Sequence, residues 1–214
     1  MTVYKVYAFA TPNSIKAVIG LEEMGIEYGI AGINVRKGEQ KTSAYLALNP
    51  NGKVPVLVDE DRDEGELILS ESAAILVYLA ERHGKLLPKT GSARARVFEQ
   101  LFFHASGIAP AFGQSGFFQK NAAERLPLAI DRFQSEANRT AAVLDEVLAR
   151  RQYVAGDDYT IADIAHFGWM WRREYANVDL ADLPNLARWY ESVATRPAVL
   201  RAIKRIEALV PSEA

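Results

Sequence analysis

The chain has 214 residues, of which 49% are apolar and 24% are charged, so it can bury one large core or two smaller ones. Its 25 lysine and arginine residues nearly balance 27 aspartate and glutamate residues, and the net charge of −2 argues against a nucleic-acid partner. No cysteine is present, so any sulfur chemistry must use sulfur brought by a ligand. Without a secretory segment at the N-terminus or an apolar run of ~20 residues, we expect a soluble cytoplasmic protein without a membrane partner.

The first third of the chain alternates between strand and helix patterns. Val3–Phe9 is rich in valine, tyrosine and phenylalanine, which indicates a strand, and Thr11–Ser14 breaks it. Apolar residues then recur at helical spacing over Ile15–Met24, and Gly25 is the expected end of that helix. Tyr28–Val35 has the pattern of a second strand, so the chain opens as a β-α-β unit.

A turn and a strand that follows a proline come next. Ser43–Leu48 has the pattern of a short helix, and Asn49–Gly52 combines Asn-Pro and Asn-Gly pairs, which favour a turn. Val56–Val58 is the next strand, and Pro55 suits its start because proline has no N–H for a sheet; a cis bond also suits this position. The backbone groups of Val54 are then unpaired and able to bind a peptide-like ligand.

A hairpin and a helix complete this part of the chain. Leu67–Leu69 is expected to pair with the preceding strand, and we interpret the acidic segment Asp59–Glu66 between them as a solvated turn, not a metal site. A helix over Ala73–Arg82 completes the order β-α-β-α-β-β-α, and its first amides are expected to face the same cleft as Val54. Together these features predict a site for a small, anionic peptide.

The composition changes after residue 83. Residues 84–92 contain glycine, proline, lysine and threonine, and we interpret them as a linker. Beyond it, helical periodicity is carried by Arg94–Phe103, Ala129–Arg150, Ile161–Trp171, Leu183–Thr195 and Ala198–Leu209. The change predicts an α/β domain over residues 1–83 and an all-helical domain over residues 93–214.

The Thr160-Ile161-Ala162-Asp163 segment has the spacing of a helix capping box. The threonine hydroxyl is expected to accept from the amide three residues later, and the aspartate to accept from the amide of Thr160. An acidic residue there also suits the helix dipole. We therefore exclude Thr160 and Asp163 from the catalytic candidates.

Three segments carry a resemblance to a known family. They are Asn49–Pro55, Ser70–Ile75 and Tyr159–Ala165, and in this order and spacing they resemble the glutathione transferase family over nearly the whole chain. The resemblance implies a thioredoxin-like N-terminal domain followed by an all-helical C-terminal domain, and a two-fold homodimer.

A finer resemblance is to the bacterial nu-class transferases, which are also described as glutathione-dependent disulfide-bond oxidoreductases. It rests on Thr11–Asn13, Gly38–Gln40, Gly107–Gln114 and Ala129–Phe133, which lie in both predicted domains. It implies that glutathione is the cosubstrate and that a small disulfide or electrophile is the second substrate.

The resemblance assigns glutathione binding to five residues. The backbone of Val54 resembles the group that pairs with the cysteinyl unit, while Glu71 and Ser72 resemble the pair that holds the γ-glutamyl end. Ser72 would donate to a carboxylate at a helix N-terminus, and Glu71 would accept from the ligand ammonium. Gln40 and Lys53 resemble contacts to the glycyl end. The alternatives are a simple helix cap for Glu71 and Ser72, and a solvated turn lysine for Lys53.

The chemical step requires a thiolate, because the thiol is a poor nucleophile. Thr11 and Asn13 lie between the first strand and the first helix, where the helix dipole favours negative charge. In the nu-class resemblance both approach the sulfur. Other transferase classes contact the sulfur through a tyrosine of the first strand or a serine at the following helix start, so Tyr7 and Ser14 are alternative candidates. The simpler interpretation is that Tyr7 is a core aromatic of the strand and that Ser14 is a helix cap. Thr11 and Asn13 could also be turn residues only.

A chain without cysteine cannot form a mixed disulfide itself, so it can only direct a glutathione thiolate at a bound disulfide or electrophile. A second glutathione, or glutathione disulfide, would bind as well. Arg132 resembles the residue that contacts this second molecule, and its alternative is an ordinary arginine paired within its own helix. No metal is expected, because no ligand spacing relates the three histidines, His83, His104 and His166.

Three functions compete at this point. The first is a glutathione-dependent thiol-disulfide oxidoreductase. The second is a conventional glutathione S-transferase that acts on electrophiles such as aryl halides. The third is a non-catalytic binding module that keeps the scaffold. The set Val54-Pro55, Glu71, Ser72 and Lys53 favours an enzyme, because a scaffold does not need residues that anchor a ligand.

Overall fold

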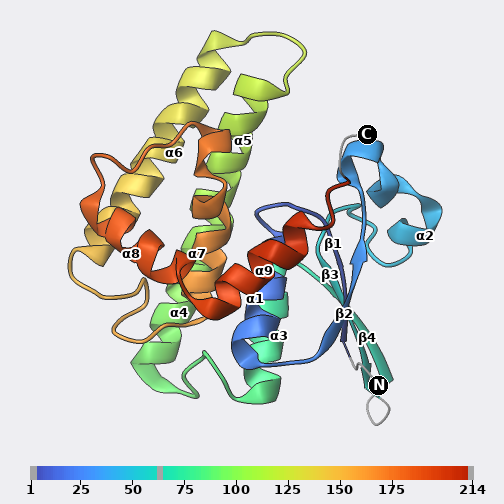
Figure 1. Cartoon of the computed structure of the whole chain (residues 1–214). Coiled ribbons are helices and arrows are strands. Elements are labelled where there is room, and N and C mark those ends of the chain that lie inside the picture. The colour runs from blue at the N-terminus through green and yellow to red at the C-terminus, as the bar shows by residue number, and fades with distance from the viewer. Residues whose placement is uncertain (1–3, 62–64, 212–214) are drawn as a thin grey trace. The chain divides into compact units, whose positions relative to one another are not determined.

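The computed structural model describes residues 4–61 and 65–211 (Figure 1). The chain divides into two compact units. The first comprises the chain up to Leu86 together with the segment from Thr195 onward, and the second comprises Leu87–Ala194. The last helix therefore lies in the first unit, whereas the sequence analysis grouped residues 93–214 together.

The first unit is a mixed four-stranded sheet with helices on both faces. Its elements are β1 (Tyr4–Ala8), α1 (Ser14–Met24), β2 (Tyr28–Gly32), α2 (Ser43–Leu46), β3 (Val56–Asp61), β4 (Gly65–Ser70), α3 (Ser72–His83) and α9 (Pro197–Glu207). The strand order is β2-β1-β3-β4, with β1 parallel to β2 and the other pairs antiparallel. Helices α1 and α3 cover one face and α2 lies on the other (Figure 1). The predicted order of elements is confirmed.

The alternation of side chains in β3 explains both layers. Val56 and Val58 pack with Tyr45 of α2 on one face, whereas Leu57, which has no exposed surface, points to the opposite face. Because both faces of β3 are covered, the strand is apolar without interruption over Val56–Val58.

The second strand is shorter than predicted. It ends at Gly32, and a 3-10 helix occupies Val35–Lys37. The side chain of Asn34 accepts hydrogen bonds from the backbone N–H groups of Arg36 and Lys37, which begins this helix. A local side-chain cap therefore overrides the strand pattern.

The predicted hairpin is confirmed, but Asp59 is not part of a solvated turn. It lies in β3 opposite Leu67 and is 1% exposed. Its carboxylate accepts from the hydroxyl of Tyr78 and pairs with Arg82 at 3.5 Å. The solvated-turn interpretation is therefore wrong for Asp59, because two partners from α3 stabilise a buried charge there. Residues 62–64 of the acidic segment lie outside the described residues.

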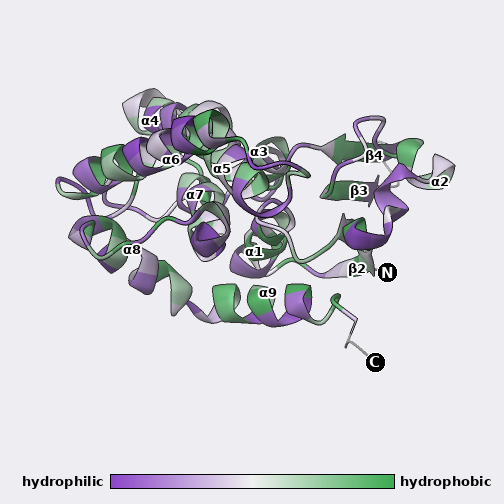
Figure 2. Ribbon diagram, turned by 90° about the horizontal axis from the view of Figure 1, so that it is seen from above, coloured by the Kyte–Doolittle hydropathy of each residue, from purple (hydrophilic) through white to green (hydrophobic). Residues whose placement is uncertain are grey.

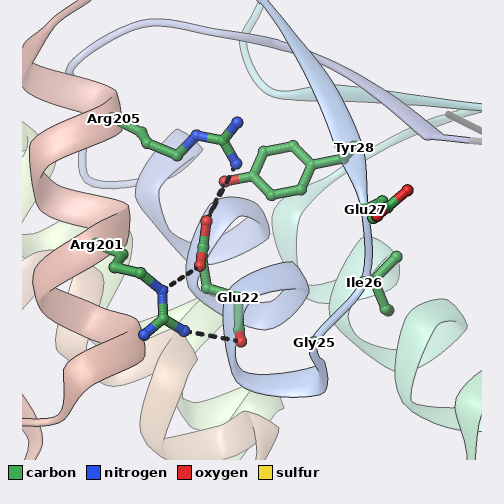
Figure 3. Close-up of a pocket in the computed structure, with 7 residues that line it drawn as sticks. All are labelled: Glu22, Gly25, Ile26, Glu27, Tyr28, Arg201 and Arg205. Atoms are coloured by element: carbon green, nitrogen blue, oxygen red, sulfur yellow. Dashed lines mark hydrogen bonds and ion pairs between the residues drawn. The ribbon is translucent and has the colours of Figure 1, made fainter.

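Helix α9 packs on α1 through an apolar face and a group of ion pairs. Ala198, Val199, Ala202 and Ile206 are its buried residues. Figure 3 shows the charged group beside this face, where Glu22 accepts from Arg201 at 2.7 Å and from Arg205 at 3.1 Å. Tyr28 donates to the same carboxylate at 2.9 Å. The depression of about 430 Å³ beside these residues is lined by charges of both signs, of which Glu22, Arg201 and Arg205 already pair with one another.

The second unit is helical. It contains α4 (Gly91–Phe103), a π-helical turn (His104–Ile108), α5 (Ala109–Lys120), α6 (Pro127–Leu148), α7 (Ile161–Trp171), a 3-10 helix (Arg173–Ala176) and α8 (Pro184–Ala194). Every residue from Ile161 to Met170 is buried, so α7 is the core helix of this unit. In Figure 2 the ribbon of α9, by comparison, alternates between hydrophobic and hydrophilic segments, as expected for a helix with one buried face. The sequence analysis did not predict α5, because its glycine and proline residues obscure the helical pattern.

The predicted capping box at the start of α7 is confirmed. The Thr160 hydroxyl accepts from the backbone of Ala162 at 3.3 Å, and Asp163 accepts from the backbone of Thr160 at 2.9 Å. Asp163 also accepts from Val154 and from the indole of Trp189. These contacts give Asp163 a structural function, as expected.

Within the described part of the chain, the helices are too short or too polar to span a lipid bilayer.

Candidate functional site

Strand pairing brings the predicted site segments to one end of the sheet in the first unit. Tyr7 near the end of β1 pairs with Val56 at the start of β3, and Val56 pairs with Ser70 at the end of β4. Ala8 pairs with Gly32, the last residue of β2. The segment after β1, the residues before β3 and the start of α3 therefore meet at the same sheet end, which we call the ligand end.

Val54 lies at the ligand end with an open backbone. The Val54–Pro55 peptide bond is cis, as the sequence allowed. Val54 is 8% exposed, and no described residue forms a hydrogen bond with its backbone N–H or carbonyl group. A nearly buried backbone without a partner is uncommon, and it offers one donor and one acceptor to an extended peptide.

The turn before Val54 is held by side chains from α2 and from the turn itself. The carbonyl of Lys53 accepts from the Tyr45 hydroxyl and from the Asn49 side-chain amide, each at 2.8 Å. Asn49 also accepts from the backbone of Asn51 at 3.0 Å. The side chain of Lys53 is exposed, as a solvated turn lysine would be, while its carbonyl is fixed.

Gln40 approaches this turn at Gly52. Gly52 has a φ of 62°, and a Cβ there would lie 3.2 Å from the Gln40 carbonyl oxygen, so glycine permits the close approach. The side-chain nitrogen of Gln40 donates to Val35 at 3.4 Å. Its oxygen Oε1 is buried without a hydrogen-bond partner among the described residues. Gln40 therefore lies against the turn that contains Lys53.

Glu71 and Ser72 form the start of α3. Glu71 has a φ of 66°, unusual for a residue other than glycine, and its side chain caps no helix amide. Ser72 is the first residue of the helix and is 9% exposed. Its hydroxyl has no partner among the described residues, and the first N–H groups of a helix favour an anion. Glu71 therefore occupies the N-cap position of α3, but its side chain does not act as the cap.

Thr11 provides the cap for α1 in place of Ser14. The Thr11 hydroxyl accepts from the backbone N–H of Ser14 at 3.1 Å and donates to the Ser14 hydroxyl at 3.0 Å. Ser14 has no exposed surface, and its hydroxyl also accepts from the backbone of Phe9 at 3.3 Å. Ser14 is therefore engaged inside the loop and is a poor candidate for contact with a ligand.

Asn13 immediately precedes α1, and its side chain contacts a buried lysine. The Lys16 ammonium donates to Asn13 Oδ1 at 2.8 Å. Lys16 has no exposed surface, and this burial lowers its pKa to about 7, while the negative charge of Glu71 acts in the opposite direction. Sequence reasoning missed Lys16, because one lysine within a helix normally indicates a solvent face. Its place three residues after Asn13 was the available signal.

Tyr7 is a packing residue, which supports its simpler reading. Its ring packs edge-on against Tyr45 with centroids 6.3 Å apart, and the Lys5 ammonium lies 4.9 Å from the ring centroid. Tyr7 borders the apolar cluster on the α2 face of the sheet.

Arg132 belongs to the second unit. It lies on α6 with 65% of its side chain exposed, and it pairs with Glu136 one turn later at 3.4 Å. This is the intrahelical pair of the alternative reading. An exposed pair of this kind is weak, so it leaves the guanidinium available to an anion.

The histidines of the second unit are core residues. His104 is 2% exposed, and its ring lies 5.2 Å from that of His166, which contacts the Gln100 carbonyl oxygen at 3.1 Å. Within residues 4–61 and 65–211, no cluster of histidine, aspartate and glutamate side chains has the arrangement of a metal site.

Comparison with known proteins places these observations in a family. The models of the glutathione S-transferase N-terminal and C-terminal domains match residues 10–82 and 109–197. The chain is 37% identical over 205 residues to the disulfide-bond oxidoreductase YfcG of Escherichia coli, covering 94% of each protein.

Two solved structures are similar over nearly the whole chain. A glutathione transferase family member from Pseudomonas fluorescens, with two glutathione molecules bound, has a TM-score of 0.90 and 36% identity, covering 94% of this chain and 92% of that one. A glutathione transferase from Pseudomonas putida, with one glutathione disulfide bound per subunit, has a TM-score of 0.89 and 34% identity, with 95% and 91% covered.

Proposed function

Because the chain belongs to the glutathione transferase family, we propose that it binds glutathione at the ligand end of the first unit and uses the bound thiolate to reduce disulfides. The open backbone of Val54 beside the uncapped start of α3 carries this proposal. A peptide with two carboxylates and one ammonium matches that combination of groups.

Five residues bind glutathione in this proposal. The Val54 backbone pairs with the cysteinyl unit, which places the thiol near the segment after β1. Ser72 and the first amides of α3 hold the γ-glutamyl carboxylate, and Glu71 accepts from the ammonium. Gln40 and Lys53 bind the glycyl end, Lys53 through its exposed ammonium. The buried Oε1 of Gln40, which lacks a partner, supports a polar contact there.

Thr11 and Asn13 stabilise the thiolate in this proposal. The hydroxyl proton of Thr11 can rotate from Ser14 to the sulfur while Oγ1 still accepts from the Ser14 backbone. Asn13 offers its side-chain N–H₂ group, and the N-terminus of α1 adds a favourable dipole. Hydrogen bonds to the charged form lower the thiol pKa.

The reaction consists of two thiol-disulfide exchanges. The bound thiolate attacks one sulfur of the substrate disulfide, so a mixed disulfide forms and the other sulfur leaves as a thiolate that takes up a proton. A second glutathione thiolate then attacks the glutathione sulfur of this mixed disulfide. The products are glutathione disulfide and two thiols, and Arg132 holds a carboxylate of the second glutathione.

The test is the glutathione-dependent reduction of 2-hydroxyethyl disulfide, compared with conjugation of 1-chloro-2,4-dinitrobenzene. We expect disulfide reduction to have the higher kcat/KM, and Asn13→Ala to lower it by about tenfold or more, as loss of one hydrogen bond to a charged sulfur predicts. Faster conjugation would instead favour a conventional transferase. No binding of glutathione in calorimetry would favour a non-catalytic module.

We further propose a homodimer, which the family resemblance implies. Light scattering of the purified protein tests it, and the mass of a single 23.7 kDa chain would contradict it. The cytoplasmic location remains a prediction from the sequence.

A further inference from the structure

Lys16 is a fully buried ionisable residue that the proposed mechanism does not use. It lies in the first turn of α1, with its ammonium 2.8 Å from Asn13 Oδ1, and has no exposed surface. Burial lowers the pKa of Lys16 to about 7. A buried lysine lowers the free energy of unfolding compared with an apolar side chain of the same length. A function of Lys16 at this position would account for its presence.

The contact with Lys16 determines which way the Asn13 amide points. A protonated lysine has three donors and no acceptor, so only the oxygen of the Asn13 amide can face it favourably. The two polar atoms of the planar amide point to opposite sides, and Nδ2 is therefore directed away from Lys16. No described residue accepts a hydrogen bond from this Nδ2.

The orientation matters for a negatively charged ligand atom. With Nδ2 outward, Asn13 donates to a thiolate and stabilises it. With the amide reversed, Oδ1 would face the thiolate, repel it and raise its pKa. Asparagine alone does not select between these orientations, because its oxygen and nitrogen ends have nearly the same shape.

We propose that Lys16 is a positioning residue that fixes the Asn13 amide with its N–H₂ group directed at the glutathione sulfur. This inference rests on the proposed function, because it requires glutathione at the ligand end. Lys16 does not touch the ligand and acts through Asn13. The negative charge of Glu71 keeps Lys16 more protonated than burial alone would allow, and so supports the donor state.

The experiment measures the thiol pKa of bound glutathione from the ultraviolet absorbance of the thiolate, at saturating ligand. It compares the wild type with Lys16→Met, Asn13→Ala and the double variant. Methionine fills nearly the same space without a donor, so the fold is retained. We expect Lys16→Met to raise the thiol pKa by about one unit, a tenfold loss of thiolate at a fixed pH. Lys16→Gln, which keeps a neutral donor, should fall between the wild type and Lys16→Met.

The double variant separates action through Asn13 from a direct effect of the lysine charge. If Lys16 acts through Asn13, Lys16→Met should add nothing once Asn13 is alanine. Equal additive effects in both backgrounds, or an unchanged thiol pKa in Lys16→Met, would overturn the inference while leaving the proposed function standing. Lys5→Met, an exposed lysine of β1, is the control for loss of one charge and should leave the thiol pKa unchanged.

An unchanged thiol pKa in Asn13→Ala is a different failure. It would remove Asn13 from the activation scheme of the proposed function and overturn the Lys16 inference with it.

Discussion

The hydroxyl of Tyr45 donates a hydrogen bond of 2.8 Å to the carbonyl of Lys53, the residue before Val54. Burial raises the pKa of Tyr45 to about 12, so the hydroxyl remains a donor at neutral pH. The contact ties α2 to the turn that presents the Val54 backbone. Tyr45 therefore helps to fix the geometry of the backbone that we propose binds glutathione.

Tyr45→Phe tests this hydrogen bond between α2 and the turn. Loss of the hydroxyl should cost ~1 kcal/mol of folding free energy and weaken glutathione binding by about fivefold, because the Lys53 carbonyl keeps only its bond from Asn49. Calorimetry and urea unfolding measure the two effects. Tyr28→Phe is a matched control, since its hydroxyl donates to Glu22 beside α9; stability should fall with no change in affinity.

Ser72→Ala tests the anion site at the start of α3. The backbone N–H groups remain and only the hydroxyl is lost, so we expect Kd for glutathione to rise by about tenfold, ~1.4 kcal/mol. Because the hydroxyl has no partner in the described part of the chain, the free energy of unfolding without ligand should change little. Ser106→Ala, whose hydroxyl donates to its own helix at the Phe102 carbonyl, should leave Kd as it is. An unaltered Kd in Ser72→Ala would place the γ-glutamyl carboxylate elsewhere.

Lys16 predicts a pH dependence of stability. Its pKa is about 7 in the folded chain against 10.5 for an ordinary exposed lysine, so between these pH values the unfolded chain binds more protons. The free energy of unfolding from this group therefore rises with pH across that window, by at most about 1.4 kcal/mol per pH unit. Urea unfolding of the wild type and Lys16→Met at several pH values above 7 measures it. Lys16→Met should have a higher free energy of unfolding than the wild type, and this difference should shrink as pH rises. A difference that stays constant with pH would contradict the lowered pKa of Lys16.

Asp163→Asn tests the capping box of α7. Burial raises the pKa of Asp163 to about 6, while hydrogen bonds from Val154 and Thr160 act in the opposite direction. The side chain is therefore a carboxylate at neutral pH. Asparagine would turn an N–H₂ group toward donors, which should destabilise the protein by ~2–4 kcal/mol. Thermal unfolding measures the loss, and Asp158→Asn, at an exposed neighbour, should have almost no effect.

Much of the fold could be predicted because local rules and tertiary structure agree. Gly25 ends α1 in a left-handed conformation, Pro55 precedes β3, and Thr160 begins α7 with its hydroxyl. Helix α5 escaped prediction because its glycines leave room for aromatic rings of its own unit, and packing overrides their low helix propensity. A Cβ at Gly116, for example, would overlap the ring of Tyr175.

The candidate site was predicted by resemblance, and the structure adds what resemblance does not carry. Periodicity does not distinguish a buried lysine from an exposed one, so Lys16 was not considered. In the same way Asp59 has the pattern of a turn acid, and only its partners Tyr78 and Arg82, about twenty residues later, show that it is buried. Charges paired over long sequence distances leave no short-range signal.

The position of α9 has a consequence for how the protein is made. The thioredoxin-like part is assembled from segments before and after the helical unit, since Arg196 pairs with Glu23 across 173 positions. During synthesis α9 becomes available to the N-terminal part only after the entire helical unit has left the ribosome. The segment that follows the helical unit thus completes the part that precedes it.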